Sequence, residues 1–319
     1  MDREARMPKP FDLHPEMRLL TEAAAAQPPA SGIAEMRANW ARYTAVTNRP
    51  PPPDMETHDR TIPATAMAVP VRVYRPAGVG DRAPTLLYFH GGGFMKGDLD
   101  SSETVAWGFA EKIGAVVVSV DYRLAPEHPY PAAFEDCRAV LAYVAAHPDE
   151  FGADPERIAL AGDSAGGNLA AAVSLAARDR GGPAVAAQAL IYPVLGCDLT
   201  LPSYVANAEA PGLTTASMEF YWKLYVGGEG RTEDPYAAPL AARDFAGLPP
   251  TMIHTAEHDP LLDDGVAFAE RLRAVGVPVE YRCARRMIHG FLRARLHGPD
   301  AAAEYDAICA FLRRYLTEG

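Results

Sequence analysis

Hydrophobic residues recur along the chain with two different spacings, and the change from one to the other divides it into segments. In residues 1–50 the apolar positions recur at helical spacing, which predicts helices with one apolar face. That face either packs on the body of the protein or forms a lid over a binding cleft. A run of prolines at residues 50–53 ends this pattern and predicts a stiff connector. The residues that define the apolar face are Ile33, Met36, Trp40 and Tyr43.

From about residue 57 the spacing becomes that of strands. Residues 69–74 alternate between apolar and polar, which predicts an antiparallel strand with one exposed face. The later strand candidates are continuously apolar, as expected of central strands covered on both faces, and helical segments separate them. Strand and helix therefore alternate from residue 85 onward, which predicts a mostly parallel central sheet flanked by helices. The strand candidates are 85–90, 115–120, 187–192, 251–255 and 279–283, and the helix candidates are 102–113, 132–146, 265–274 and 301–316.

Residues 197–243 interrupt this alternation, because they hold no strand pattern. They contain a helix candidate with aromatic residues on one face. This insertion either pads the surface or joins residues 1–50 to form a helical cap over the sheet. The other residues, 51–196 and 244–319, make up the predicted α/β body. The residues on the apolar face of the inserted helix are Met218, Tyr221, Trp222 and Tyr225.

The composition is that of an ordinary globular protein with a sizeable core, with 49% hydrophobic and 22% charged residues in 319. The net charge of -11, without any Lys/Arg-rich run, argues against nucleic acid or an anionic membrane as a partner. We see no signal peptide and no apolar run long enough to cross a bilayer. The cysteines are far apart and form no Cys-x-x-Cys motif, which predicts reduced thiols in a cytoplasmic protein. They are Cys137, Cys197, Cys283 and Cys309.

The segment from Gly162 to Gly166 reads Gly-Asp-Ser-Ala-Gly and lies between a short apolar strand candidate and a helix candidate. Gly-x-Ser-x-Gly in that context is the nucleophile-elbow pattern, in which glycines on either side of the serine permit a sharp turn. The plain alternative, an ordinary turn, does not account for the flanking strand and helix. We therefore predict that Ser164 is a nucleophile and that Asp163 supports the turn without reacting.

A serine nucleophile needs a base and a group that orients the base, in the order Ser, Asp or Glu, His. His289 follows the last strand candidate and precedes the terminal helix, so we predict that it is the base, with His297 as the fallback. Asp259 lies in the turn that leaves the strand at 251–255, and we prefer it as the acid. Asp263 is the second choice.

Two other acids were considered for that role. Glu257 lies in the same turn as Asp259. Asp264, like Asp263, precedes a predicted helix, and the plain interpretation of such residues is capping of the helix N-terminus.

The negative oxygen of a tetrahedral intermediate needs preorganised donors. The amide of Ala165 is one candidate, and the glycine triplet from Gly91 to Gly93, directly after a strand candidate, supplies others. An ordinary flexible loop is the plain alternative. A phosphate-binding loop is excluded because Lys96 is followed by Gly97 and no Gly-Lys-Ser/Thr is present. The triplet would also bring Phe94 to the cleft.

No metal or other cofactor is expected. His254 and His258 are four residues apart, which suits two ligands on a helix, but here the pair spans a strand and a turn. Asp121 and Glu127 lie beside Arg123, and a structural ion pair is the better interpretation of these acids than a catalytic carboxylate pair.

Taken together, these motifs resemble the hormone-sensitive-lipase family of bacterial esterases, which has the α/β-hydrolase fold. The resemblance covers the chain from about residue 74 to the C-terminus and rests on motifs that occur in the family's order. These are His90-Gly91-Gly92-Gly93-Phe94, Asp121-Tyr122-Arg123-Leu124-Ala125-Pro126-Glu127, Gly162-Asp163-Ser164-Ala165-Gly166-Gly167-Asn168, Asp259-Pro260-Leu261-Leu262-Asp263 and His289-Gly290-Phe291.

The resemblance implies a carboxylesterase for small, short-acyl esters, with Asp259 as the acid. It also implies a helical cap formed by residues 1–50 and 197–243 over a catalytic domain of residues 51–196 and 244–319. It also implies Gly92 and Gly93 as oxyanion donors, with Gly91 left open. An amidase or lactonase with the same machinery is the alternative, and a true lipase ranks lower. A non-catalytic receptor on this fold is disfavoured because His289 is present. The expected partner is a small-molecule ester, with a homodimer possible, and the residues expected to bind substrate are Phe94, Trp40, Tyr192 and Phe291.

Overall fold

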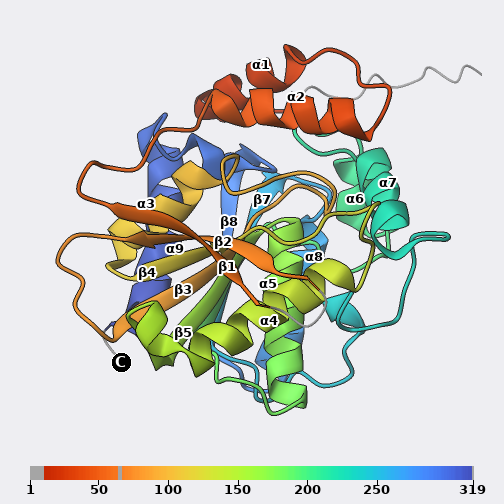
Figure 1. Ribbon diagram of the computed structural model, residues 1–319. Helices are drawn as coiled ribbons and strands as arrows, with labels where there is room; N and C mark the ends of the chain where they lie inside the picture. The colour runs from red at the N-terminus through yellow and green to blue at the C-terminus, as the bar shows by residue number, and fades with distance from the viewer. Residues whose placement is uncertain (1–10, 64–66, 318–319) are drawn as a thin grey trace, which may run out of the picture.

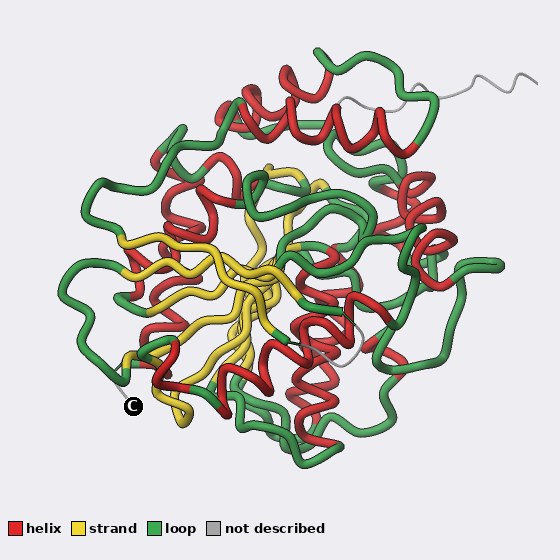
Figure 2. Tube along the Cα trace, in the orientation of Figure 1, coloured by secondary structure: helices red, strands yellow, loops and turns green. Residues whose placement is uncertain are grey.

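A single sheet of eight strands runs through the centre of the molecule, with helices on both faces (Figures 1 and 2). The computed structural model describes residues 11–63 and 67–317. The strand order is β1-β2-β4-β3-β5-β6-β7-β8; β2 pairs antiparallel with β1 and β4, and every other pair is parallel. The predicted mostly parallel α/β sheet is confirmed. The strands are β1 Glu56–Ile62, β2 Val69–Arg75, β3 Ala83–Phe89, β4 Val116–Val120, β5 Ala153–Asp163, β6 Ala187–Ile191, β7 Thr251–His258 and β8 Val279–Ile288.

In the part of the chain that the structure describes, five helices form the outer layers of this α/β body. Helices α3 (Glu103–Ile113) and α9 (Pro299–Leu316) pack on each other and on one face of the sheet. Helices α4 (Ala132–Ala146), α5 (Ala165–Asp179) and α8 (Leu262–Ala274) cover the other face. None of the described helices is both long enough and apolar enough to cross a membrane.

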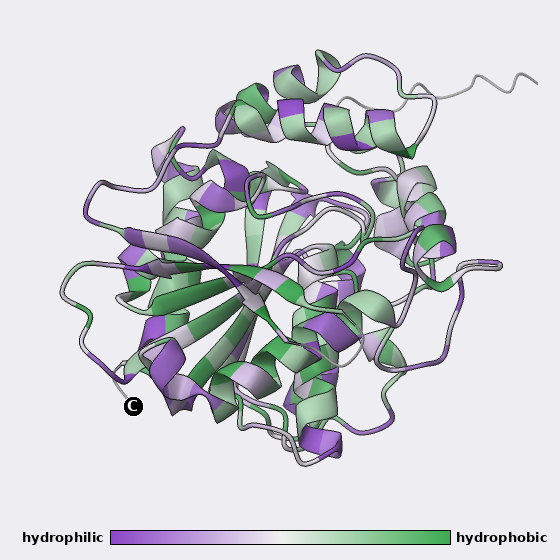
Figure 3. Ribbon diagram, in the orientation of Figure 1, coloured by the Kyte–Doolittle hydropathy of each residue, from purple (hydrophilic) through white to green (hydrophobic). Residues whose placement is uncertain are grey.

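The strands divide the core into two halves by the alternation of their side chains. On β5, Ile158 and Leu160 pack with the α4 and α5 side, whereas Ala159 and Ala161 pack with the α3 and α9 side. Successive residues of a strand point to opposite faces, so a strand buried on both faces is apolar at most of its positions. This is why the central strands are mainly hydrophobic in sequence and in Figure 3.

Among the described residues, four further helices lie outside the α/β body. The N-terminal segment forms α1 (Arg18–Ala25) and α2 (Ile33–Ala45), which lie across one end of the sheet (Figure 1). The insertion contributes α6 (Pro202–Ala206) and α7 (Thr215–Val226), near the far end of α2. Both segments are helical, as predicted; residues 1–10 of the predicted cap segment lie outside the described residues.

Arg37 fastens α2 to the α/β body. Its guanidinium donates to the carbonyl oxygens of Met95 (2.8 Å) and Ala125 (3.1 Å) and to both carboxylate oxygens of Glu127 (2.8 and 2.6 Å). This fork holds the pKa of Glu127 at about 2, well below its usual range. A bidentate pair of this kind fixes orientation as well as position, so α2 is docked in one register.

The sequence predicts that Asp121 and Glu127 form ion pairs with Arg123. This prediction is wrong, because the structure gives these side chains other surroundings. Arg123 bonds Asp136 of α4 at 2.7 Å, whereas Glu127 reaches Arg37 of α2. Asp121 has no cationic partner within 4 Å among the described residues, and burial raises its pKa to about 6, with the nearby charges of Asp98 and Asp100 adding to the rise. The partners come from elements distant in sequence, which local spacing does not report.

Asp264 is fully buried and ties the start of α8 to the chain that leaves β6. One carboxylate oxygen, Oδ2, accepts the amides of Leu195 (2.8 Å) and Gly196 (2.9 Å). Burial raises the pKa of this carboxyl to about 7, against the opposing effect of the two amides. Its role is therefore to satisfy two buried donors and not to cap its own helix.

We expect Asp264→Leu to lower the free energy of unfolding by about 2–4 kcal/mol relative to Asp264→Asn, because leucine leaves two buried amides without an acceptor. The measurement is urea unfolding of both variants at pH 6, where the wild-type carboxyl is mostly neutral. Equal stability of the two variants would contradict this role.

Candidate active site

Ser164 lies at the tip of a sharp turn between β5 and α5. Its backbone has φ 58° and ψ −118°, a strained conformation for a residue with a side chain. The flanking glycines are required sterically: a Cβ on Gly162 would lie 2.1 Å from the carbonyl oxygen of Gly166, and one on Gly166 would lie 1.9 Å from that of Phe89. The predicted elbow is therefore present, and it presses the start of α5 against the end of β3.

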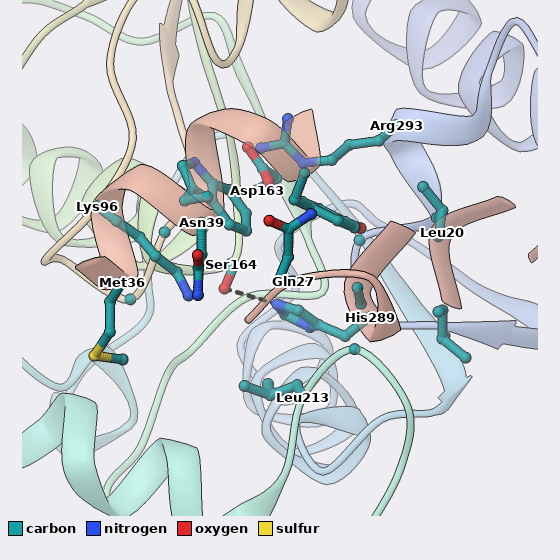
Figure 4. Close-up of a pocket in the computed structure, with 18 of the residues that line it drawn as sticks. Leu20, Gln27, Met36, Asn39, Lys96, Asp163, Ser164, Leu213, His289 and Arg293 are labelled. Carbon is teal, nitrogen blue, oxygen red and sulfur yellow. Dashed lines mark hydrogen bonds between the residues drawn. The ribbon is translucent and has the colours of Figure 1, made fainter. Parts of the chain in front are cut away.

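His289 and Asp259 form a hydrogen-bonded chain with Ser164. His289 Nε2 lies 2.9 Å from Ser164 Oγ, and His289 Nδ1 lies 2.7 Å from Asp259 Oδ2 (Figure 4). Asp259 is fully buried, and its other oxygen accepts the amide of Leu261 at 2.9 Å, which fixes the plane of the carboxylate. With its proton on Nδ1, the imidazole donates to Asp259 and accepts from the serine hydroxyl.

The other residues considered for the acid and base positions have different partners. Asp263 accepts the amide of Ser203 at 2.7 Å, and Glu257 accepts that of Arg286 at 2.6 Å. His297 is not among the residues that line the cavity beside Ser164. Among the acids weighed in the sequence, the structure brings Asp259 into contact with His289.

Asp163, next to the serine, supports the glycine loop. Its Oδ1 accepts the hydroxyl of Tyr88 at 2.6 Å and the amide of Gly91 at 2.9 Å. The amide of Gly91 is thus already engaged by Asp163. Within the described part of the chain, the amides of Gly92 and Gly93 have no hydrogen-bond acceptor.

The amide of Ala165 is the third donor of this group. Ala165 is the first residue of α5, where backbone amides lack an intrahelical acceptor. Both glycines and Ser164 border the same cavity, so unengaged amides lie on two sides of the serine. Such amides are suited to an oxygen that gains negative charge.

A cavity of about 290 Å³ opens at Ser164 and His289. Helix α2 contributes Met36, Trp40 and Tyr43 to its wall, and the insertion contributes Leu213 and Tyr221. The wall is mostly apolar and aromatic, as in a site for a small organic molecule. Both helical segments outside the α/β body therefore border the candidate site.

Of the residues expected to bind substrate, Trp40 and Tyr192 line the cavity, whereas Phe94 and Phe291 do not. Phe94 has φ +60°, and its buried ring stacks on Tyr225 with centroids 3.6 Å apart. Phe291 is fully buried against Tyr192. The prediction is wrong for these two rings, because nearness in sequence to a catalytic position does not fix the direction of a side chain.

Lys96 and Arg293 also line the cavity, and sequence reasoning missed both. In the sequence, Lys96 is informative only because the Gly97 that follows it excludes a phosphate-binding loop. Arg293 lies four residues after His289, within the turn η4 (Phe291–Ala294), and nothing in its surroundings in sequence indicates a place in the site.

The two histidines weighed as metal ligands have other partners. His254 Nε2 lies 2.8 Å from a carboxylate oxygen of Glu304, and His258 Nε2 lies 3.0 Å from the carbonyl oxygen of Asp12. The absence of a metal stays a prediction. Among the described residues, one group could gather ligand atoms, but it lies outside the cavity, and Glu16 within it accepts the amides that begin α9. The group is His14, Glu16 and Asp300.

Comparison with known proteins agrees with this geometry. The family model described as alpha/beta hydrolase fold matches residues 86–293. The chain is 45% identical over 268 residues to carboxylesterase NlhH of Mycobacterium tuberculosis, covering 83% of this chain and 84% of that protein. It is 34% identical over 250 residues to an arylesterase of Saccharolobus solfataricus, covering 76% and 79% respectively.

Among solved structures, the ester-hydrolase EH1AB1 from the metagenome of Lake Arreo superposes with a TM-score of 0.88 at 36% identity, covering 94% of this chain and 98% of that one. The central sheet, its helices and the serine turn define the class of alpha/beta hydrolases. The chain belongs to the alpha/beta-hydrolase family and, within it, to the branch similar to hormone-sensitive lipase.

Replacing Asp163 by leucine should slow the reaction of Ser164 with a fluorophosphonate probe by at least about tenfold, because the buried amide of Gly91 and hydroxyl of Tyr88 would lose their acceptor and the glycine loop would shift. Asp163→Asn keeps an acceptor oxygen and should react faster than Asp163→Leu. The rate of labelling is measured on folded protein, checked by circular dichroism. Wild-type labelling by Asp163→Leu would refute the supporting role.

Proposed function

We propose that this protein is a carboxylesterase that hydrolyses small, short-acyl esters through Ser164, His289 and Asp259. The observation that carries the proposal is the unbroken hydrogen-bonded chain from the serine hydroxyl through the imidazole to a buried, oriented carboxylate. This arrangement of nucleophile, base and orienting acid activates a hydroxyl for acyl transfer.

The enzyme class follows from the family. A serine hydrolase acting on carboxylic ester bonds is the class to which the 45%-identical relative, a carboxylesterase, belongs. The nucleophile elbow supports this enzyme class independently, because the strained Ser164 borders the cavity and lies directly before the first amide of α5.

In the proposed mechanism, Ser164 Oγ attacks the ester carbonyl while His289 Nε2 accepts its proton. Asp259 holds the imidazole with Nδ1 protonated and stabilises the imidazolium. The amides of Gly92, Gly93 and Ala165 donate to the tetrahedral oxyanion. His289 then protonates the departing alcohol, which leaves an acyl-enzyme on Ser164. Water attacks that ester with His289 as base, and Ser164 is released.

The preference for small esters is inferred from the cavity. Its volume of about 290 Å³ accommodates a short acyl chain and a compact alcohol, and helices on two sides restrict longer substrates. We infer that residues 1–50 and 197–243 act as the cap, and that residues 51–196 and 244–319 form the catalytic domain. Substrate size is then set by cap residues such as Met36 and Leu213.

A rate series of 4-nitrophenyl esters from acetyl to dodecanoyl, with a 4-nitroanilide included, tests the reaction and the size limit together. We expect the highest kcat/KM for the short acyl chains and little turnover of the anilide. Ser164→Ala should abolish ester turnover and remain folded, since it removes only the attacking oxygen. Turnover retained by this variant would falsify the mechanism.

The choice of acid predicts unequal effects of two similar substitutions. Asp259→Asn should lower kcat by a factor on the order of 10⁴, because the amide favours the wrong imidazole tautomer. Asp263→Asn serves as the matched control, since Asp263 contacts Ser203 and not His289. A larger loss from Asp263→Asn would mean that the acid is misassigned. The measurement is steady-state hydrolysis of 4-nitrophenyl butyrate at pH 8.

A further inference from the structure

Lys96 differs from the other lysines that the structure describes, because it has no acidic partner. Lys112 pairs with Asp306 at 3.1 Å, and Lys223 pairs with Glu219 at 2.6 Å. Within the described residues, no carboxylate oxygen lies within 4 Å of Lys96 Nζ. Lys96 is partly buried and lines the cavity together with Ser164 and His289.

The ammonium group of Lys96 is held by aromatic rings. Its Nζ lies 4.8 Å from the ring centroid of Trp40 and 5.1 Å from that of Tyr221. It donates one hydrogen bond, at 2.9 Å, to the hydroxyl of Tyr221. An ammonium group has three donors, so two remain for another acceptor. The rings fix the position of the charge without neutralising it.

The remaining charges that line the cavity offset one another. Arg293 is buried, donates to the carbonyl oxygen of Ser101 at 2.8 Å, and interacts electrostatically with Asp163. Asp163 is the acidic residue that lines the cavity, and both of its oxygens have hydrogen-bond donors nearby. Among the described residues that line the cavity, no opposite charge is therefore left to offset that of Lys96, in a chain whose net charge is -11.

The direction of the side chain places this charge within reach of a bound substrate. Figure 4 shows Lys96 extending from the glycine loop toward the middle of the pocket, where Ser164 and His289 lie. A half-desolvated ammonium group with spare donors is complementary to a carboxylate, and charge-assisted hydrogen bonds of this kind are the strong ones.

We propose that Lys96 binds a carboxylate of the substrate, so that the enzyme prefers esters that carry a free carboxylate remote from the scissile bond. The proposal rests on the proposed esterase function and narrows its substrate class. The carboxylate belongs either to the acyl part, as in a dicarboxylic acid monoester, or to the alcohol part, as in an O-acylated hydroxy acid.

The test uses pairs of substrates that differ only in charge. Monoethyl glutarate and the ethyl ester of glutaramic acid place a carboxylate or a neutral amide at the same position of the acyl part. The pair 3-acetoxypropanoate and 3-acetoxypropanamide does the same for the alcohol part. The measured quantity is the ratio of kcat/KM for the charged member to that for the neutral member, in which any general change in activity cancels.

For the wild type we expect a ratio of at least about 10 in one of the two pairs, and that pair identifies the side that carries the carboxylate. In Lys96→Met, which keeps the length of the side chain between the rings but removes the charge, that ratio should fall by about 10- to 100-fold. Lys96→Arg keeps a cation and should retain most of the preference.

Lys223→Met is the matched control, because it removes the same charge from α7 while Lys223 lies outside the cavity. It should leave both ratios unchanged. A drop as large as that of Lys96→Met would mean that long-range charge, and not a contact, sets the preference, and would overturn the proposal.

Two further outcomes separate failure of the Lys96 proposal from failure of the proposed function. Wild-type ratios near 1 in both pairs, or equal losses on charged and neutral esters in Lys96→Met, would overturn the proposal and leave Lys96 as a residue that packs against the cap. No hydrolysis of any of the four esters would contradict the proposed function itself. In that case, calorimetric titration of Ser164→Ala with the two glutarate compounds still decides whether the pocket selects a carboxylate.

Discussion

The close contact between Gly166 and the end of β3 is the constraint on which the site depends. A single added Cβ at Gly166 would lie 1.9 Å from the carbonyl oxygen of Phe89, so α5 begins against the strand that leads into the glycine loop. This contact brings a serine from β5 beside amides that follow β3. The strain at Ser164 is tolerated because the packed sheet and helix leave the turn no alternative path. The candidate nucleophile and the candidate oxyanion donors are thereby brought together by one backbone contact.

Much of the fold could be predicted from sequence because its causes are local. Strands buried on both faces are apolar at most positions, and the glycines around Ser164 are dictated by steric exclusion at the turn. His289 and Asp259 could be predicted as partners in a chain with Ser164 from their order in the sequence, since parallel strands bring their carboxyl ends to one edge of the sheet. Asp259 is preferred over Asp263 in the sequence because it lies in the turn that leaves a strand, whereas Asp263 precedes the predicted helix at residues 265–274.

What could not be predicted depends on contacts between elements far apart in the sequence. Phe94 and Phe291 follow active-site motifs directly, yet their rings pack into the core, because backbone torsion and neighbouring rings decide where a side chain points. Glu127 pairs with Arg37, ninety positions away, and not with its neighbour Arg123. The role of Lys96 becomes visible only when α2 and α7 bring their rings to it.

The segment before α1 is anchored to the C-terminal part of the chain by hydrogen bonds that span most of the sequence. The amide of His14 donates to the carbonyl oxygen of Arg286 at 2.7 Å, and Glu16 accepts the amide of Ala301 at 2.7 Å. Joining residues so far apart in sequence carries a loop-closure entropy cost, which the packed sheet and helices must offset. Leu20 of α1 lines the cavity directly after this segment, so part of the cavity wall depends on contacts between the two ends of the described chain.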